Sequence, residues 1–188
     1  MIVFKVIFAS WLIALANTVF AQGTAQQVGR TGSFDLPCSA DTAFPLFSPE
    51  GEREWVKEWD PTPVFPDRIE FRRDTVFREG HPGEEAVWTI VDADWKTHRA
   101  EYVRVAAHSH TARIVVKIEP LGAERSRVVV SYTVTAFGEH AASLVAAFSE
   151  EAYAAKMRDW QQRISAYRED RKLRLTGPSA VPQTSKLR

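Results

Sequence analysis

The stretch from Glu139 to Asp170 contains no glycine or proline and is rich in Ala, Glu, Gln and Arg. This composition predicts one long helix that ends before Gly177. Its second half carries apolar residues at alternating steps of four and three, the spacing of one helical face, namely Tyr153, Met157, Trp160, Ile164 and Tyr167. Its first half carries another apolar face, turned away from the first, formed by Ala141, Leu144, Val145, Phe148 and Ala152. A helix with two such faces must contact two partners or bend. We expect the later face to lie on a sheet and the earlier face to border a cavity.

The chain before this helix alternates between apolar and polar residues from Pro66 onward, which is typical of half-buried strands. Five strand candidates, joined by short links, cover residues 71–78, 85–91, 99–106, 113–119 and 127–135. Short links between consecutive strands predict an antiparallel meander, with loops at 80–83 and 120–123. The inward face of the last strand is expected to carry Tyr132. A further edge strand is expected at 29–36.

Two serines are candidate N-caps for short helices between the first strand and the meander. Ser39 precedes a helix that Pro45 would interrupt, and Ser48 precedes a helix that opens with Pro49 and should end by Lys57. The order of elements predicts an α+β domain with a curved antiparallel β-sheet wrapped around a long C-terminal α-helix.

Residues 1–21 have the pattern of a secretory signal peptide. Lys5 precedes a mostly apolar run, and a cleavage site ends at Ala21, before Gln22. An uncleaved membrane anchor is the alternative, but the run is shorter than the ~20 apolar residues that a spanning helix needs. We expect a periplasmic or secreted protein with no membrane contact after cleavage, comprising a linker at 22–27, one domain at 28–172 and a disordered tail at 173–188.

The charge balance argues against nucleic acid as a partner, because 24 basic residues face 24 acidic residues and no basic tract is present. The single cysteine, Cys38, is expected to be a small buried apolar residue. The sequence contains no Gly-rich phosphate loop or nucleotide fingerprint, so no cofactor is expected.

The segment from Phe44 to Pro61, FPLFSPEGEREWVKEWDP, resembles the opening block of bacterial proteins in the SRPBCC superfamily. This is the START and birch-pollen-allergen-like group, which includes polyketide cyclase/dehydrase-like proteins. Residues 101–105 and 150–160 are similar in kind, so the resemblance covers roughly residues 28–170. It implies the helix-grip fold and a cavity between sheet and long helix that holds a hydrophobic or aromatic molecule. It implies no reaction, because the superfamily spans lipid carriers, hormone binders, cyclases and co-chaperones.

Aromatic residues are the first candidates for lining this cavity. Trp55 and Trp59 are expected near its mouth and Trp88 on the sheet, where each indole would offer a stacking surface for a flat ligand or would simply fill the core. Tyr132 from the sheet and Phe148 from the helix are expected to meet across the cavity. Leu144 lies on the same helical face as Phe148.

The strand at 99–106 must place a charged residue on the cavity side in either register. One register turns Glu101 inward with two valines, and the other turns Arg104 inward with Tyr102. We expect the valine register, because it buries more β-branched surface. The inward charge would then meet an opposite charge, water or ligand, or would reach solvent at the end of the strand.

His108 and His110 would share one face of a strand, so a metal site with His98 as a third ligand is one interpretation. A polar turn between two strands explains the two histidines more simply, and no metal is expected. The function expected first is a binding protein without chemistry. An enzyme of cyclase, dehydratase or hydrolase type is the alternative, with acid or base candidates Glu101, Tyr102, Arg104 and Tyr132. A third possibility is a protein-interaction domain that uses the exposed part of the long helix.

Overall fold

The computed structural model describes residues 25–81 and 85–176, with side chains described as far as Lys172. The expected signal peptide, most of the expected tail and part of the 80–83 loop lie outside the described residues. Within them, no helix is both long enough and apolar enough to cross a membrane.

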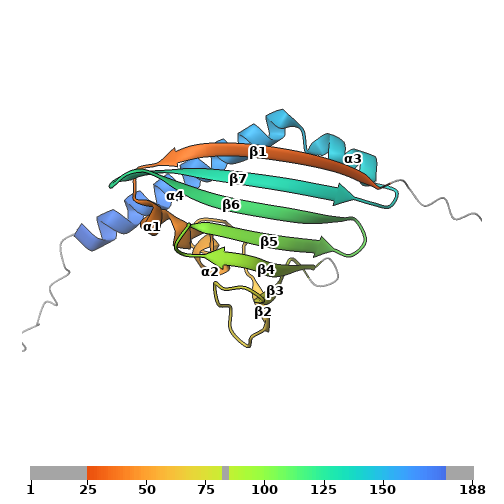
Figure 1. Ribbon diagram of the computed structural model, residues 1–188, viewed down its shortest axis with the longest axis horizontal. Helices are drawn as coiled ribbons and strands as arrows, with labels where there is room; N and C mark the ends of the chain where they lie inside the picture. The colour runs from red at the N-terminus through yellow and green to blue at the C-terminus, as the bar shows by residue number, and fades with distance from the viewer. Residues whose placement is uncertain (1–24, 82–84, 177–188) are drawn as a thin grey trace, which may run out of the picture.

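The described residues form one seven-stranded antiparallel sheet, with α4 lying across one face of it (Figure 1). The strand order is β1-β7-β6-β5-β4-β3-β2, so the meander closes with the first strand beside the last. The strands are β1 (Gln26–Leu36), β2 (Thr62–Phe65), β3 (Val76–Glu79), β4 (Ala86–Asp94), β5 (Arg99–Ala106), β6 (His110–Gly122) and β7 (Arg125–Ala136).

The two longest strands of the meander follow the alternation in the sequence. Val128, Val130 and Val134 of β7 are buried, and Tyr132 lies on the same face beneath the helices. Ile114, Val116 and Ile118 of β6 continue this face. The expected inward face of β7 is therefore confirmed, and the two strands together form the centre of the core.

Several strand boundaries differ from the expectation. β1 begins at Gln26, inside the expected linker, and β3 begins at Val76, so Phe71 lies in a loop. The Phe71 ring packs 5.0 Å from the Phe44 ring, which holds this loop against the core without strand pairing. β6 continues through Pro120 to Gly122 because a register shift there absorbs the proline, and the turn falls after Gly122. The short edge strand β2 was not predicted, since it contains a proline.

Three short helical segments follow β1, and these are α1 (Ala40–Ala43), the 3-10 helix η1 (Phe44–Phe47) and α2 (Pro49–Glu52). Both predicted N-caps are confirmed: the Oγ of Ser39 accepts from the Thr42 amide at 3.3 Å, and the Oγ of Ser48 accepts from the Gly51 amide at 2.9 Å. α2 ends at Glu52, so Trp55 lies in the turns that follow it. Cys38, just before α1, is buried as expected.

The predicted long helix is divided into α3 (Ala141–Ala147) and α4 (Glu150–Thr176), and the single-helix prediction is wrong at Phe148. Phe148 leaves the helical region with φ −86° and ψ 47°. Ser149 then caps α4, because its Oγ accepts from the Ala152 amide at 3.1 Å and two acidic residues follow it. The bend divides the earlier apolar face. Ala141 is buried and Leu144 and Phe148 are half-buried, whereas Ala152 lies on α4 and is exposed, so its expected place beside a cavity is wrong. α4 also includes residues 173–176, which were assigned to the tail.

The later apolar face packs on the sheet as expected, with Tyr153, Met157 and Ile164 buried. The Tyr153 hydroxyl donates to the Val130 carbonyl at 2.8 Å, which joins α4 to β7. Gly32 of β1 permits the close approach of α4, because a Cβ there would lie 2.6 Å from Met157 Cγ.

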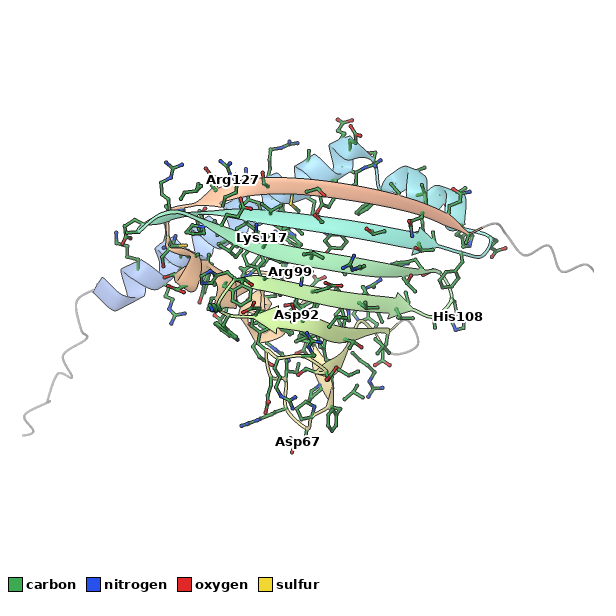
Figure 2. The ribbon with its side chains drawn as sticks, viewed as in Figure 1. Asp67, Asp92, Arg99, His108, Lys117 and Arg127 are labelled. Atoms are coloured by element: carbon green, nitrogen blue, oxygen red, sulfur yellow. The ribbon has the colours of Figure 1, made fainter. Side chains whose placement is uncertain are left out.

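The outer face of the sheet carries charged side chains in place of a second helical layer. Figure 2 shows Asp92, Arg99, Lys117 and Arg127 in a row that crosses β4, β5, β6 and β7. Arg99 contacts Asp92 at 2.9 Å, and its guanidinium also reaches Glu101 of the same strand. The sheet is therefore apolar on the helix side and ionic on the outer side.

Candidate functional site

A cavity of about 410 Å³ lies between the helix-facing side of the sheet and the segments α2, α3 and α4. Its lining combines aromatic, aliphatic and charged side chains, namely Glu52, Val56, Trp59, Trp88, Arg104, His110, Ala112, Tyr132, Val134, Leu144, Phe148, Lys156 and Trp160. A smaller, more apolar hollow shares five of these residues and adds Phe47, Pro49, Phe77, Tyr102, Ile114 and Val116. The volume is within the range of small-molecule sites in proteins.

Aromatic rings make up much of the cavity wall. The Trp59 and Trp88 rings meet edge to face at 5.5 Å, and Trp88 stacks on Phe77 at 5.8 Å. Tyr132 and Phe148 face each other at 6.0 Å between ring centres, so the contact predicted between sheet and helix is formed. These rings present broad apolar surfaces, with Leu144 beside them on α3.

Two of the sequence candidates lie away from the cavity. Trp55 packs at 5.4 Å against Trp160, and its Nε1 donates to the Leu46 carbonyl at 2.7 Å, so it serves the core. Glu101 lies on the outer face of β5, where its carboxylate accepts from Arg113 at 2.6 Å and from Arg99. These bonds, that of Arg113 foremost, lower the pKa of Glu101 to about 2.

The preferred valine register of β5 is therefore wrong, and Tyr102 and Arg104 face inward. The buried Tyr102 hydroxyl donates to the Phe47 carbonyl at 2.6 Å, whereas Val105 on the outer face is 37% exposed. With Tyr102 turned inward, its hydroxyl group finds a hydrogen-bond acceptor inside the core. With Glu101 turned outward, its carboxylate meets two guanidinium groups on the outer face. The valine register was predicted from buried β-branched surface alone, and that criterion includes neither of these two contributions.

Arg104 forms the charged end of the sheet side of the cavity. Its Nη1 lies 2.6 Å from His110 Nε2, and its guanidinium lies over the Trp88 ring at 5.6 Å. The nearest carboxylate oxygen that pairs with it, on Glu79, is 4.0 Å away. Burial and the neighbouring Arg104 lower the pKa of His110, which favours the neutral imidazole.

Lys156 of α4 brings a second cation to the same cavity. Its Nζ lies 4.5 Å from the centre of the Tyr132 ring and 5.1 Å from that of Trp160. Burial lowers the pKa of Lys156, with Glu52 acting in the opposite direction and Arg104 in the same direction. The ammonium is therefore held by ring faces, an arrangement in which aromatic quadrupoles replace part of its hydration.

Glu52, at the end of α2, lines the same cavity as Lys156, and the two groups interact electrostatically. Burial raises the pKa of Glu52 to about 8, despite the opposing effect of Lys156, and Glu79 adds to the rise. The side chain is thus predominantly protonated at neutral pH and can donate a hydrogen bond.

Two further polar groups belong to residues that line the cavity. Trp88 Nε1 is buried and has no hydrogen-bond acceptor there, in contrast to Trp59, whose Nε1 donates to the Pro49 carbonyl at 2.8 Å. The Tyr132 hydroxyl group belongs to a residue that lines the same cavity, and burial raises its pKa. A buried donor left without an acceptor is costly, so a bound acceptor would relieve it.

The sequence reasoning missed Glu52, Lys156 and the role of His110. Lys156 had a detectable signal, because it lies three residues after Tyr153 and four before Trp160, on the edge of the apolar face of α4. Glu52 lies at the end of α2 and had no signal of its own in the sequence.

The three histidines considered for a metal do not converge. His110 turns into the cavity toward Arg104, His98 contacts Asp41 at 2.7 Å, and His108 is exposed in the turn between β5 and β6 (Figure 2). Among the described residues, no cluster of three or more His, Cys, Asp or Glu side chains is placed to hold a metal ion.

A second hollow, of about 460 Å³, lies between β1 and α4 on the other side of the helix contact. Its wall includes Gly29 to Phe34 of β1 together with Ala154, Met157 and Arg158 of α4. It lacks the tryptophan rings of the first cavity, although the buried Tyr153 lines it, as does Arg30, whose Nε is buried without a hydrogen-bond partner among the described residues.

No protein-family model matches the chain, and no curated protein matches it in sequence. Solved structures do match. Norcoclaurine synthase from Thalictrum flavum, in complex with dopamine and hydroxybenzaldehyde, superposes with a TM-score of 0.55 at 12% identity, over 87% of this chain and 98% of that chain. The Zhui aromatase/cyclase from Streptomyces sp. R1128 gives a TM-score of 0.53 at 13% identity, over 83% of this chain and 100% of that chain. A solution structure from Thermobifida fusca gives a TM-score of 0.57 at 16% identity, over 74% of this chain and 94% of that chain.

These identities are low, so the likeness establishes the architecture and leaves the activity to be argued from the site. The enzymes norcoclaurine synthase and the aromatase/cyclase, like the allergen Ara h 8, which also matches, are SRPBCC proteins. The chain has the helix-grip fold of the SRPBCC superfamily, in which an antiparallel sheet holds a long C-terminal helix.

Proposed function

We propose that this chain binds a small hydrophobic or aromatic molecule in the cavity between β5, β6, β7 and the helices. The observation that carries the proposal is the cavity of about 410 Å³ walled by Trp59, Trp88, Tyr132 and Phe148. Flat apolar molecules gain most from such surfaces, because rings provide large contact areas with few rotatable bonds. The dopamine and hydroxybenzaldehyde in the norcoclaurine synthase structure are a precedent for aromatic ligands in this fold.

The test is uptake of the neutral fluorescent dye phenylnaphthylamine by the wild-type protein and by Ala112→Trp. Ala112 is buried on β6 and lines the cavity, so an indole there would occupy the space. Ala152→Trp is the matched control, because Ala152 is exposed on α4. Wild type and the control should bind the dye, and Ala112→Trp should lose at least about tenfold in affinity. Equal binding by all three proteins would overturn the proposal.

We further propose that the chain is exported and that residues 1–21 are removed. The support is the pattern of Lys5, the apolar run that follows and Ala21 before Gln22. Intact-mass measurement on protein from an exporting host should give a chain that begins at Gln22 in the soluble periplasmic or secreted fraction. Membrane-bound protein that still carries residues 1–21 would contradict export by cleavage.

Catalysis is the second candidate function, and the pair formed by Glu52 and Lys156 favours it. Burial raises the pKa of Glu52 to about 8 and lowers the pKa of Lys156, so the protonated Glu52 carboxyl group is a candidate general acid in the cavity. If the site is catalytic, a ligand that co-purifies with the exported protein should change mass when incubated with wild type and remain unchanged with Glu52→Gln. A ligand that keeps its mass with both proteins would leave binding without chemistry.

A further inference from the structure

The cavity contains two basic side chains, Lys156 and Arg104, that have few close carboxylate partners. No carboxylate of the described residues lies within ion-pair distance of the Lys156 ammonium, which instead rests on the Tyr132 and Trp160 rings. Arg104 has one carboxylate partner, Glu79, at the outer limit of 4.0 Å, and its other close contact is the imidazole of His110. Positive charge held in a partly desolvated site without close counter-ions attracts an anion.

Glu52 does not supply the missing negative charge at neutral pH. It is the carboxyl group of the described residues that lines this cavity, and its pKa of about 8 keeps it predominantly protonated. Glu79 lies outside the cavity wall. The lining therefore brings two basic side chains, Lys156 and Arg104, together with one carboxyl group whose charged form burial disfavours.

The hydrogen-bonding groups of the wall point the same way, because those without partners are donors. Trp88 Nε1 can only donate, and it is buried with no acceptor among the described residues. A protonated Glu52 and the Tyr132 hydroxyl add two further O–H donors, and the Lys156 ammonium donates only. A wall with surplus donors and surplus positive charge is complementary to an oxyanion, not to an amine.

We propose that the ligand of this cavity is an aromatic anion, whose ring system lies among the aromatic walls and whose carboxylate or similar oxyanion meets Lys156, Arg104 and Trp88. This inference rests on the proposed binding function and narrows it to a charge class. The rings that carry the cations also border the apolar space, so one ligand can contact both: Trp88 lies beneath Arg104, and Tyr132 beneath Lys156. A small amphiphilic acid with a flat body fits this distribution.

The test uses two dyes that share one body. Anilinonaphthalene sulfonate carries a permanent negative charge, and phenylnaphthylamine is its neutral counterpart. For each protein, the ratio of the two dissociation constants isolates the contribution of the anion. Lys156→Met and Arg104→Met keep much of the apolar stem of each side chain while removing its charge. Lys117→Met removes an exposed positive charge on the outer face and controls for net charge.

Both cavity variants should lower the preference for the sulfonate over the neutral dye by about tenfold. Lys117→Met should leave the ratio unchanged. If either cavity variant weakens both dyes equally, or if all four proteins give one ratio, the anion inference fails while the binding function stands. If wild type binds neither dye, the proposed function fails and the inference with it.

Discussion

The Phe148 ring lies 6.0 Å from the Tyr132 ring, and this contact forms where the chain passes from α3 into α4. Phe148 ends α3 with non-helical dihedral angles, which turn its side chain toward the sheet. The position of this wall of the cavity therefore depends on a helix break, and the break depends on the capping of α4 by Ser149. Cavity shape and local helix signals are linked at this point.

Ser149→Ala should destabilise the protein by about 1 kcal/mol, because the substitution removes the side-chain acceptor for the Ala152 amide. Chemical denaturation measures the change. Ser165→Ala is the control, since Ser165 lies in the interior of α4, where alanine is the better helix former. If the two variants unfold at the same denaturant concentration, Ser149 does not define the start of α4.

Trp160→Ala should cost ~3–5 kcal/mol of unfolding free energy, the usual range for removing a packed aromatic side chain. The Trp160 ring contacts Trp55 at 5.4 Å and Phe47 at 6.5 Å, so its loss leaves a gap between α4 and the short helices. Gln162 is exposed on the same turn, and Gln162→Ala should change stability by less than about 0.5 kcal/mol. Equal midpoints would mean that the packed face of α4 is misassigned.

Glu52→Gln should stabilise the protein relative to wild type by an amount that grows between pH 5 and pH 8. The pKa of Glu52 rises from 4.5 to about 8 on folding, so in this window the folded state binds more protons than the unfolded state. Wild type therefore loses stability as pH rises, and the loss levels off above the folded pKa. The charged and titratable groups that act on Glu52 or feel its charge are Lys156, Glu79, Tyr102 and Tyr132.

Thermal melts of both proteins at several pH values measure this effect. The difference in Tm should be small near pH 5 and reach roughly 5 °C or more at pH 8. A Tm difference that is constant across this range would show that Glu52 titrates at its ordinary pKa and does not face a desolvated cavity.

Glu101→Gln should act with the opposite pH dependence. The Arg113 and Arg99 guanidinium groups hold the pKa of Glu101 at about 2, below its ordinary value of 4.5. The contribution of the Glu101 charge to the free energy of unfolding is therefore fully present above pH 4.5 and is lost as the pH falls toward 2. Because Arg113 is more than half exposed, we expect wild type to exceed the variant by only about 1 kcal/mol at pH 7.

Denaturation at pH 7 and at the lowest pH where both proteins fold checks this difference. The advantage of wild type should shrink as the pH falls below 4.5. An advantage that is independent of pH would indicate that Glu101 contributes through packing and not through its charge.

The sequence was sufficient for the antiparallel meander without its edge strand β2, for the two serine caps and for the packed face of α4, because each depends on local spacing. The inward side of β5 was misassigned because propensity counts β-branched surface, whereas the decisive contacts are remote in sequence. Tyr102 bonds to Phe47, and Glu101 pairs with Arg113 across two strands. The helix break had a local signal in Ser149 and the two acids after it, but the lack of glycine and proline outweighed it.

The charged part of the cavity could not be read from the sequence for a related reason. Glu52, Arg104 and Lys156 come from three elements separated by more than a hundred positions between first and last, and their proximity follows from the fold. Their shifted protonation equilibria follow from burial, which spacing alone does not specify.

The cavity beside Tyr132 and Phe148 is the proposed binding site. The most direct test is an NMR measurement of nuclear Overhauser effects between the protons of a bound dye and the methyl protons of the protein. With phenylnaphthylamine bound, nuclear Overhauser effects should connect the dye to the methyl groups of Ala112, Val134 and Leu144, which line the cavity. The methyl groups of Ala154 and Met157, in the hollow between β1 and α4, should show none. Contacts to Ala154 and Met157 with none to the cavity methyl groups would contradict the account.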